Sequence, residues 1–119
     1  MKNAMIVNAI TPDILLRAYA AGIFPMAESR DDPQIHWVDP RRRGILPLDG
    51  FHISRSLRRR LLRADWRVTA DTAFAETVQA CANRDETWIN DTIFANYVAL
   101  HHAGHAHSVE VWEGDALIG

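Results

Sequence analysis

The chain has 119 residues, 48% of them hydrophobic and 24% charged, and its formal net charge is −2. This length and apolar content predict a globular chain of one domain, or of one domain and the start of another. No apolar run is long enough to span a bilayer, and the N-terminus lacks the features of a secretion signal. We therefore expect no membrane association and a cytoplasmic location.

The first predicted element is a short helix over residues 11–22. Thr11 can cap this helix, and Pro12 suits its first turn. Gly22 can end it by adopting a left-handed backbone conformation.

Residues 23–50 contain four of the five prolines, which predicts turns and short extended pieces. A strand is possible at residues 35–38. We expect Phe24, Trp37 and Ile45 to anchor this segment to the core. It is therefore interpreted as a structured loop region rather than a free linker.

A second helix is predicted over residues 55–64, with Ser54 as its cap. Leu57 and Leu61 share one face because they are four residues apart. Arginines recur on another face, namely Arg55, Arg59 and Arg63, with Arg58 between them.

A strand over residues 66–70 and a third helix follow. The third helix runs through Phe74, Val78 and Cys81, and Asp71 is its predicted cap. Cys81 is the only cysteine, which excludes an internal disulfide. Its helical spacing from Phe74 predicts a small core residue rather than a nucleophile.

The fourth predicted helix places Ile93, Tyr97 and Leu100 in register and ends at Gly104. Beyond it, His107 to Trp112 alternate with the period of a half-buried strand, and a return strand begins after a turn. These elements predict an α+β fold. Because the return strand barely begins, it would leave a sheet edge unpaired, so we expect a partial chain.

The charges are unevenly distributed along the sequence. Only Asp49 and Asp65 oppose the nine of thirteen basic residues that lie in one segment, namely Arg41, Arg42, Arg43, Arg55, Arg58, Arg59, Arg60, Arg63 and Arg67. A solvated helix face usually mixes acids with bases, whereas residues 52–64 contain no acid. This favours a phosphate-rich partner such as nucleic acid, held through phosphate contacts that do not read base sequence.

The sequence HHAGHAH raises the alternative of a metal site. His101 and His105 are four residues apart, but the helix end at Gly104 separates them, and no further ligand completes a set. We therefore predict no metal, and we expect the histidines, including His107, to cap and pack a junction between helix and strand.

Two other arrangements remain as alternatives. Ser54, His52 and Asp49 could form a hydrolytic triad on paper, but no nucleophile-elbow sequence surrounds them. Trp88 lies between polar residues ahead of a helix. It could cover the core or stack on a nucleotide base, and the sequence favours neither.

Several blocks of sequence together identify a family. They are LLRAYAAGIFPM, WVDPRRRGILPLDGFHISRSLRR, VTADTAFAETVQACA, ETWI and LHHAGHAHSVEVWEGDALIG. In this order and at these distances they closely resemble the N-terminal half of the leucyl/phenylalanyl-tRNA–protein transferases. The resemblance extends from about Ile10 to Gly119 without a large gap.

The resemblance implies an aminoacyltransferase. Such an enzyme moves leucine or phenylalanine, with methionine a further candidate, from aminoacyl-tRNA to proteins that begin with Arg or Lys, marking them for degradation. It implies a monomer without metal or dissociable cofactor. The implied domains are a small tRNA-facing α/β domain over residues 1–104 and, over residues 105–119, the first strands of an acetyltransferase-like catalytic domain.

The resemblance also implies roles for particular residues. Trp88 corresponds to a tryptophan near the tRNA 3′ end, and Met26 follows GIFP where members carry Trp or Met near the substrate. Four arginines are implied to hold tRNA: Arg55 and Arg59 match residues at the acceptor stem, while Arg58 and Arg63 extend the same surface. The catalytic groups and the pocket that separates Leu from Phe are expected beyond Gly119, so we expect the isolated chain to be inactive.

Two functions from other classes compete with this interpretation. One is a stand-alone RNA-binding module without catalysis. The other is a partner-binding domain whose arginines contact an acidic protein.

Overall fold

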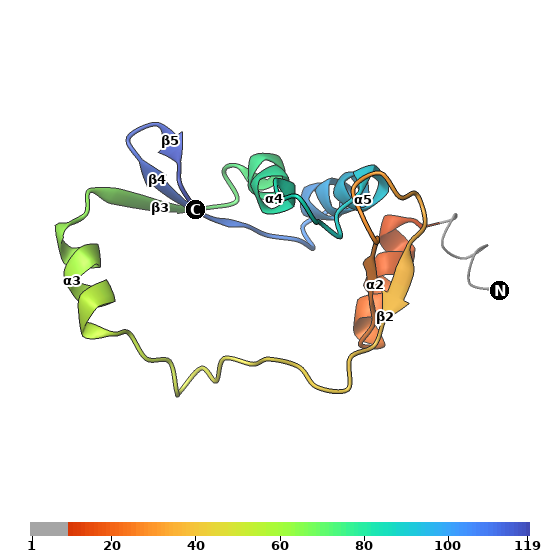
Figure 1. Cartoon of the computed structure of the whole chain (residues 1–119), viewed down its shortest axis with the longest axis horizontal. Helices are drawn as coiled ribbons and strands as arrows, with labels where there is room; N and C mark the ends of the chain where they lie inside the picture. Colours follow the sequence, from red (N-terminus) through yellow and green to blue (C-terminus); the bar gives the residue numbers. More distant parts are fainter. Residues whose placement is uncertain (1–9) are drawn as a thin grey trace.

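The structure is a computed structural model, and it describes residues 10–119 (Figure 1). Four helices and two small antiparallel sheets make up this part of the chain, which confirms the predicted α+β class. In chain order the elements are α2 (Pro12–Ala20), β1 (Phe24–Met26), β2 (His36–Val38), α3 (Arg55–Arg63), β3 (Trp66–Ala70), α4 (Phe74–Ala82), α5 (Asp91–His102), β4 (Val109–Glu113) and β5 (Ala116–Leu117). Within residues 10–119, no helix has the length and apolarity that a membrane crossing requires.

Side-chain caps fix where three of the helices begin. Thr11, Ser54 and Asn90 accept hydrogen bonds from backbone N–H groups in the first turns of α2, α3 and α5, at 3.2, 3.2 and 2.9 Å. Gly22 and Gly104, which follow α2 and α5, both have φ of +85°. The predicted caps of α2 and α3 are therefore confirmed. The predicted ends of α2 and α5 are confirmed as well, because left-handed backbone suits glycine.

The core lies between α4, α5 and the β1–β2 hairpin. Its buried cluster consists of Ala27, Ile35, Ala82, Ile89 and Ile93, with half-buried aromatic residues around it. The hydroxyl groups of Tyr19 and Tyr97 lie 2.6 Å apart and join α2 to α5. Burial raises the pKa of Tyr97 above its ordinary value, and the hydrogen bond to Tyr19 adds to this shift.

Two predictions for α4 are wrong. Cys81 is exposed, whereas Phe74 and Ala82 are buried, so the apolar face of α4 passes through residue 82 rather than residue 81. Asp71 does not cap α4, which begins after Ala73 with no side-chain cap.

Asp71 instead has φ of +60°, and its side chain contacts the start of β4. Its carboxylate accepts a hydrogen bond from the Ser108 N–H at 3.0 Å and lies 2.8 Å from His107 Nδ1. The residue thus joins the end of β3 to the start of β4, a long-range contact that local sequence does not encode.

The larger sheet has the order β3–β4–β5, and Thr69 lies opposite Glu110 in its register. The predicted alternation in β4 is present, but the buried side is the polar one. Glu110 is fully buried, whereas Val109 is 66% exposed. The division at residue 104 stays a prediction, and β3 and β4, which lie on either side of it, share this sheet.

Residues 41–63 form a projecting arm, in which every residue is exposed. The arm leaves β2 as extended chain and ends in α3, at the far side of the molecule from β2 (Figure 1). Phe24 and Trp37 are half-buried as expected, but Ile45 is 82% exposed and does not anchor the chain. The radius of gyration, 16.9 Å, exceeds the value of about 13.5 Å expected for a compact chain of this length because the arm extends away from the core.

Candidate functional site

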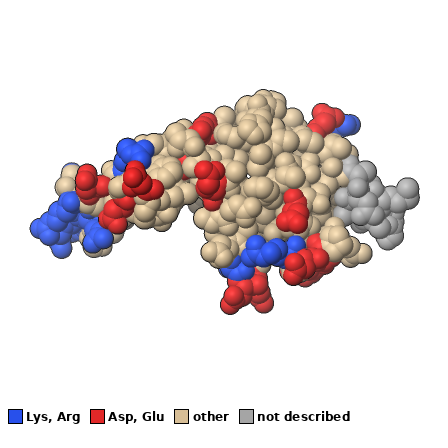
Figure 2. Space-filling model, turned by 90° about the horizontal axis from the view of Figure 1, so that it is seen from above, with Lys and Arg blue, Asp and Glu red and all other residues tan. Residues whose placement is uncertain are grey.

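Helix α3 presents the predicted basic face to solvent. None of its residues is buried, and Leu57 and Leu61 are 45% and 47% exposed. Figure 2 shows Lys and Arg atoms gathered at the end of the molecule where α3 lies, with acidic atoms beside them. Among the contacts of residues 10–119, no carboxylate forms an ion pair with any of the five arginines of α3.

The arginines before α3 are arranged differently. Arg43 donates a hydrogen bond to the Gly22 carbonyl oxygen and lies 3.5 Å from the Asp39 carboxylate. Arg43 is therefore bound to the end of α2, and the extended segment 44–54 separates it from α3. The basic residues that form one segment in the sequence do not form one surface.

A hollow of about 460 Å³ lies between α3 and the adjoining end of the β3–β4 sheet. Its charged lining residues are three arginines and two acids, namely Arg59, Arg60, Arg63, Asp65 and Glu113. The guanidinium carbon of Arg60 lies 5.5 Å from the ring centroid of Trp66, in cation–π geometry. Sequence reasoning found the arginine row but missed Glu113, which only strand pairing brings here.

A second cavity, of about 400 Å³, is lined by both Met26 and Trp88. The structure therefore brings together the two predicted substrate-binding residues. Met26 is the last residue of β1, and the N–H of the next residue, Ala27, donates to the Trp88 carbonyl oxygen at 2.9 Å. This backbone hydrogen bond holds the two walls in place.

Trp88 covers the core, which is the first of the two alternatives that the sequence left open, and part of it also remains accessible. It is half-buried, packs against the core cluster and meets the Tyr97 ring edge-on, with a centroid separation of 6.3 Å. It also lines the open cavity, where a base or an apolar side chain could contact it. Its substrate-binding role stays a prediction.

The rim of the Met26–Trp88 cavity carries charged groups that sequence reasoning missed. Glu28 lies 3.7 Å from His36 across the β1–β2 hairpin. Arg84 and Glu86, in the segment that precedes α5, also line the cavity. No motif marks these residues because they come from three separate segments. The register of β1 and β2 places His36 opposite Met26, and the Ala27–Trp88 backbone hydrogen bond brings the segment that contains Arg84 and Glu86 to the same cavity.

The two regions do not meet. Helix α3 and strand β2, which supplies part of the Met26–Trp88 cavity lining, lie toward opposite ends of the longest dimension of the molecule (Figure 1), whose extents are 53 × 32 × 30 Å. A ligand that contacts both must therefore be an extended molecule.

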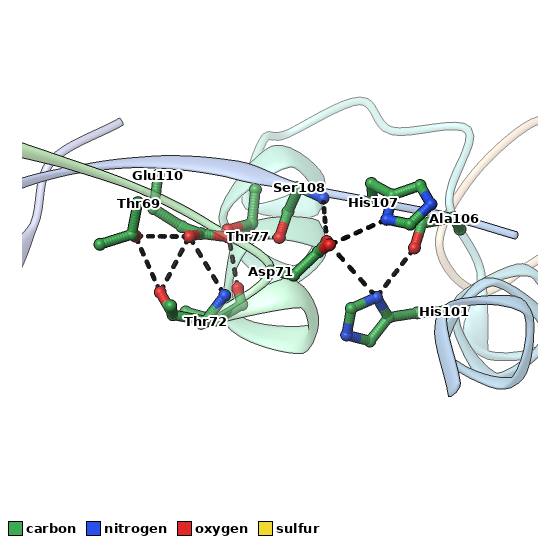
Figure 3. A network of polar contacts seen from close by, with 10 residues as sticks. Thr69, Asp71, Thr72, Thr77, His101, Ala106, His107, Ser108 and Glu110 are labelled. Carbon is green, nitrogen blue, oxygen red and sulfur yellow. Dashed lines mark hydrogen bonds and ion pairs between the residues drawn. The ribbon is translucent and has the colours of Figure 1, made fainter. Parts of the chain in front are cut away.

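Between them lies a polar network centred on the buried Glu110 (Figure 3). The carboxylate accepts hydrogen bonds from the hydroxyl groups of Thr69 at 2.6 Å, Thr72 at 2.9 Å and Ser108. The hydroxyls of Ser108 and Thr69 are the main cause that lowers the pKa of Glu110 to about 2, against the effect of burial. Hydrogen bonds thus hold a buried carboxylate in its charged form.

The neighbouring histidines serve the same junction (Figure 3). The His107 imidazole lowers the pKa of Asp71, and Asp71 in turn raises the pKa of His107 above its ordinary value. His101 stacks on Phe74 with a ring separation of 4.3 Å, and its Nδ1 lies 2.8 Å from the Ala106 carbonyl oxygen. The predicted packing role of His101 is confirmed. His107 is exposed and joins the junction only through its contact with Asp71, and His105 is exposed as well.

The structure also bears on the alternatives of metal binding and hydrolysis. Within residues 10–119, no group of three or more His, Cys, Asp or Glu side chains is placed to hold a metal ion. The Ser54 hydroxyl caps α3 and lies 3.3 Å from the Ser56 hydroxyl, and no hydrogen bond joins it to His52 or Asp49.

Within residues 10–119 the arginines of α3 are exposed and have no carboxylate partner, a surface typical of the class of proteins that bind polyanions. Comparisons with known proteins place the chain more narrowly. Residues 8–41 match the family described as leucyl/phenylalanyl-tRNA protein transferase N-terminal domain, and residues 45–119 match the family described as leucyl/phenylalanyl-tRNA protein transferase. The chain belongs to the leucyl/phenylalanyl-tRNA protein transferase family.

Curated relatives carry the same description. The chain is 75% identical over 111 residues to a leucyl/phenylalanyl-tRNA–protein transferase of Cereibacter sphaeroides (strain ATCC 17025), covering 93% of this chain and 52% of the relative. Proteins of the same name from Ruegeria sp. (strain TM1040) and Ruegeria pomeroyi are 63% and 58% identical, with 92% and 93% of this chain covered. The chain thus spans about half the length of these relatives.

Proposed function

We propose that this protein takes part in the transfer of leucine or phenylalanine, with methionine a further candidate, from aminoacyl-tRNA to an N-terminal Arg or Lys of acceptor proteins. The transfer would mark those proteins for degradation in the cytoplasm. The observation that carries the proposal is the convergence of Met26 and Trp88 on one cavity in a chain of this family.

The proposed reaction does not require the protein to activate the acyl group. An aminoacyl ester is already activated, so its carbonyl carbon can be attacked directly by a neutral α-amine. The new amide bond forms as the bond to the ribose oxygen of the tRNA breaks, and the proton that the amine loses is balanced by one that the ribose oxygen gains as it leaves as a hydroxyl group. Rate enhancement then comes mainly from holding the amine and the ester in attack geometry. We accordingly propose no metal and no dissociable cofactor.

The arginines of α3 and the Met26–Trp88 cavity would bind different parts of the tRNA. Exposed guanidinium groups of Arg55, Arg58, Arg59 and Arg63 are suited to bidentate contacts with phosphates of the tRNA body. Met26 and Trp88 offer an apolar and an aromatic wall to the charged 3′ end. The extended form of tRNA matches the separation of the two regions, and we propose a monomer as the working unit.

Transfer is tested with this chain alone and with a chimera that joins it to the remaining half of the Cereibacter sphaeroides relative. The readout is radiolabelled leucine or phenylalanine moved from charged tRNA to an Arg-initiated peptide. We expect transfer by the chimera and none by the chain alone, because the chain spans only about half of its relatives.

The relative itself is the control for assay conditions. A folded chimera that binds tRNA but transfers nothing, while the relative is active, would contradict the proposal and favour an RNA-binding module without catalysis. Transfer by the 119-residue chain alone would place the chemistry in this half and refute the proposed division.

A further inference from the structure

The hollow beside α3 is lined by positively and negatively charged side chains that do not form ion pairs with one another within residues 10–119. Arg59, Arg60 and Arg63 face it from the helix, and Asp65 and Glu113 face it from the sheet. Within residues 10–119 none of these five side chains forms an ion pair with another. All five residues are exposed, so their charged groups are available to a ligand.

The two acids are fixed by the backbone of the sheet. Glu113 is the last residue of β4 and lies opposite Trp66, the first residue of β3, in the antiparallel register. Asp65 directly precedes β3. Because α3 ends at Arg63, the chain must place the last arginines of the helix next to these carboxylates.

This arrangement is unsuited to a ligand that offers only phosphates. Each carboxylate repels a phosphate bound by the neighbouring arginines, so a site for phosphate alone would have a higher affinity without the two carboxylates. Carboxylates accept hydrogen bonds, and their presence favours a ligand that carries a hydroxyl or amino donor close to each phosphate. The ribose of RNA carries such a donor, its 2′-hydroxyl, on every nucleotide, whereas DNA carries none.

We propose that the hollow binds a ribose–phosphate unit of RNA, with Arg59 and Arg63 on the phosphate and Asp65 and Glu113 accepting from 2′-hydroxyl groups. The acids would then make the α3 surface selective for RNA over other polyanions. Arg60, whose guanidinium lies over the Trp66 ring, also lines the site. The inference rests on the proposed function in so far as tRNA is the RNA that is bound.

Binding to two forms of one short RNA hairpin tests the proposal. One form has its natural 2′-hydroxyls, and the other carries 2′-fluorine, which keeps the A-form helix and every phosphate but cannot donate a hydrogen bond. Fluorescence anisotropy gives the Kd of the 119-residue chain for each form. We expect the hydroxyl form to bind more tightly by on the order of tenfold, the effect of one hydrogen bond to a charged acceptor.

Glu113→Ala and Asp115→Ala form a matched pair of variants. Both remove an exposed acid at the same end of the sheet, but Asp115 lies in the β4–β5 turn and does not line the hollow. Glu113→Ala should bring the ratio of the two Kd values toward one, because only the hydroxyl form loses a hydrogen bond, whereas both forms are freed from the repulsion between Glu113 and phosphate. Asp115→Ala should leave that ratio unchanged, and thermal melting confirms that both variants fold.

Equal Kd values of the wild-type chain for the two RNA forms would overturn the proposal, as would the same ratio in both variants. A ratio that changes with the base sequence of the hairpin would also overturn it, because it would assign the acids to base amino groups. Failure of the proposed function gives a different result, because the chain would still prefer the hydroxyl form and lose that preference in Glu113→Ala, while the chimera would transfer no amino acid to the Arg-initiated peptide.

Discussion

Replacing Arg55 and Arg59 together by alanine should reduce the salt dependence of tRNA binding by a calculable amount. Each phosphate contact to double-stranded nucleic acid contributes about −0.9 to the slope of log K against log salt. Five exposed arginines without carboxylate partners within residues 10–119 therefore allow a slope of up to about −4.5 from α3. The double variant should lower its magnitude by about 1.8.

The fold should not change in this variant. Both side chains are exposed and alanine favours helix, so the free energy of unfolding should shift by no more than about 0.5 kcal/mol. Filter binding of tRNA over a series of salt concentrations measures the slope, and thermal melting measures stability.

Arg43→Ala supplies the matched control. The Arg43 guanidinium is already engaged by the Gly22 carbonyl oxygen and by Asp39, so its removal should leave the slope almost unchanged. If the double variant kept the wild-type slope, or if Arg43→Ala lowered the slope as much, α3 would not be the tRNA contact.

The remaining predictions concern the cavity and the polar junction. Trp88→Phe should keep part of the transfer activity of the chimera, whereas Trp88→Ala should lose most of it and about 2 kcal/mol of stability, since Trp88 is only half-buried; equal losses in both variants would indicate a purely structural tryptophan. Glu110 has a folded pKa of about 2 against an ordinary 4.5, so the stability that it contributes is present above pH 4.5 and is lost as pH falls toward 2. Glu110→Gln should remove that dependence in acid denaturation curves. His107 has a raised pKa, so the stability from its contact with Asp71 is complete below pH 6.5 and is lost as pH rises through the folded pKa. NMR titration measures the pKa of His107 in the wild-type chain and in the Asp71→Asn variant, and equal pKa values in the two proteins would contradict this. Added zinc should leave Tm unchanged because Nδ1 of both His101 and His107 is already engaged.

The sequence by itself determined most of the local structure. Thr11 and Ser54 begin their helices as predicted, and Gly22 and Gly104 follow the helices that they were expected to end. Caps and left-handed glycines act within a few residues of the chain, so their effects are encoded where they occur. The order of the sequence blocks also sufficed to predict the family.

Which surfaces are buried was decided by tertiary structure. Cys81 and Ile45 have apolar side chains in apolar patterns, yet both are exposed. Glu110 is charged, yet it is fully buried. Its burial depends on hydroxyl donors from residues 69 and 72, which reach it only after β3 pairs with β4. Hydrophobicity alone does not predict such an outcome, because the cost of burying a charge depends on distant partners.

The candidate sites show the same division. The arginine row of α3 could be predicted because helical spacing is a local property. Met26 and Trp88 were predicted only through the family resemblance. Local sequence does not encode their meeting in one cavity or the place of Glu113 beside α3, because each depends on contacts between segments far apart in the chain. The Ala27–Trp88 backbone hydrogen bond and the β3–β4 register create these contacts, and both exist only once the chain has folded.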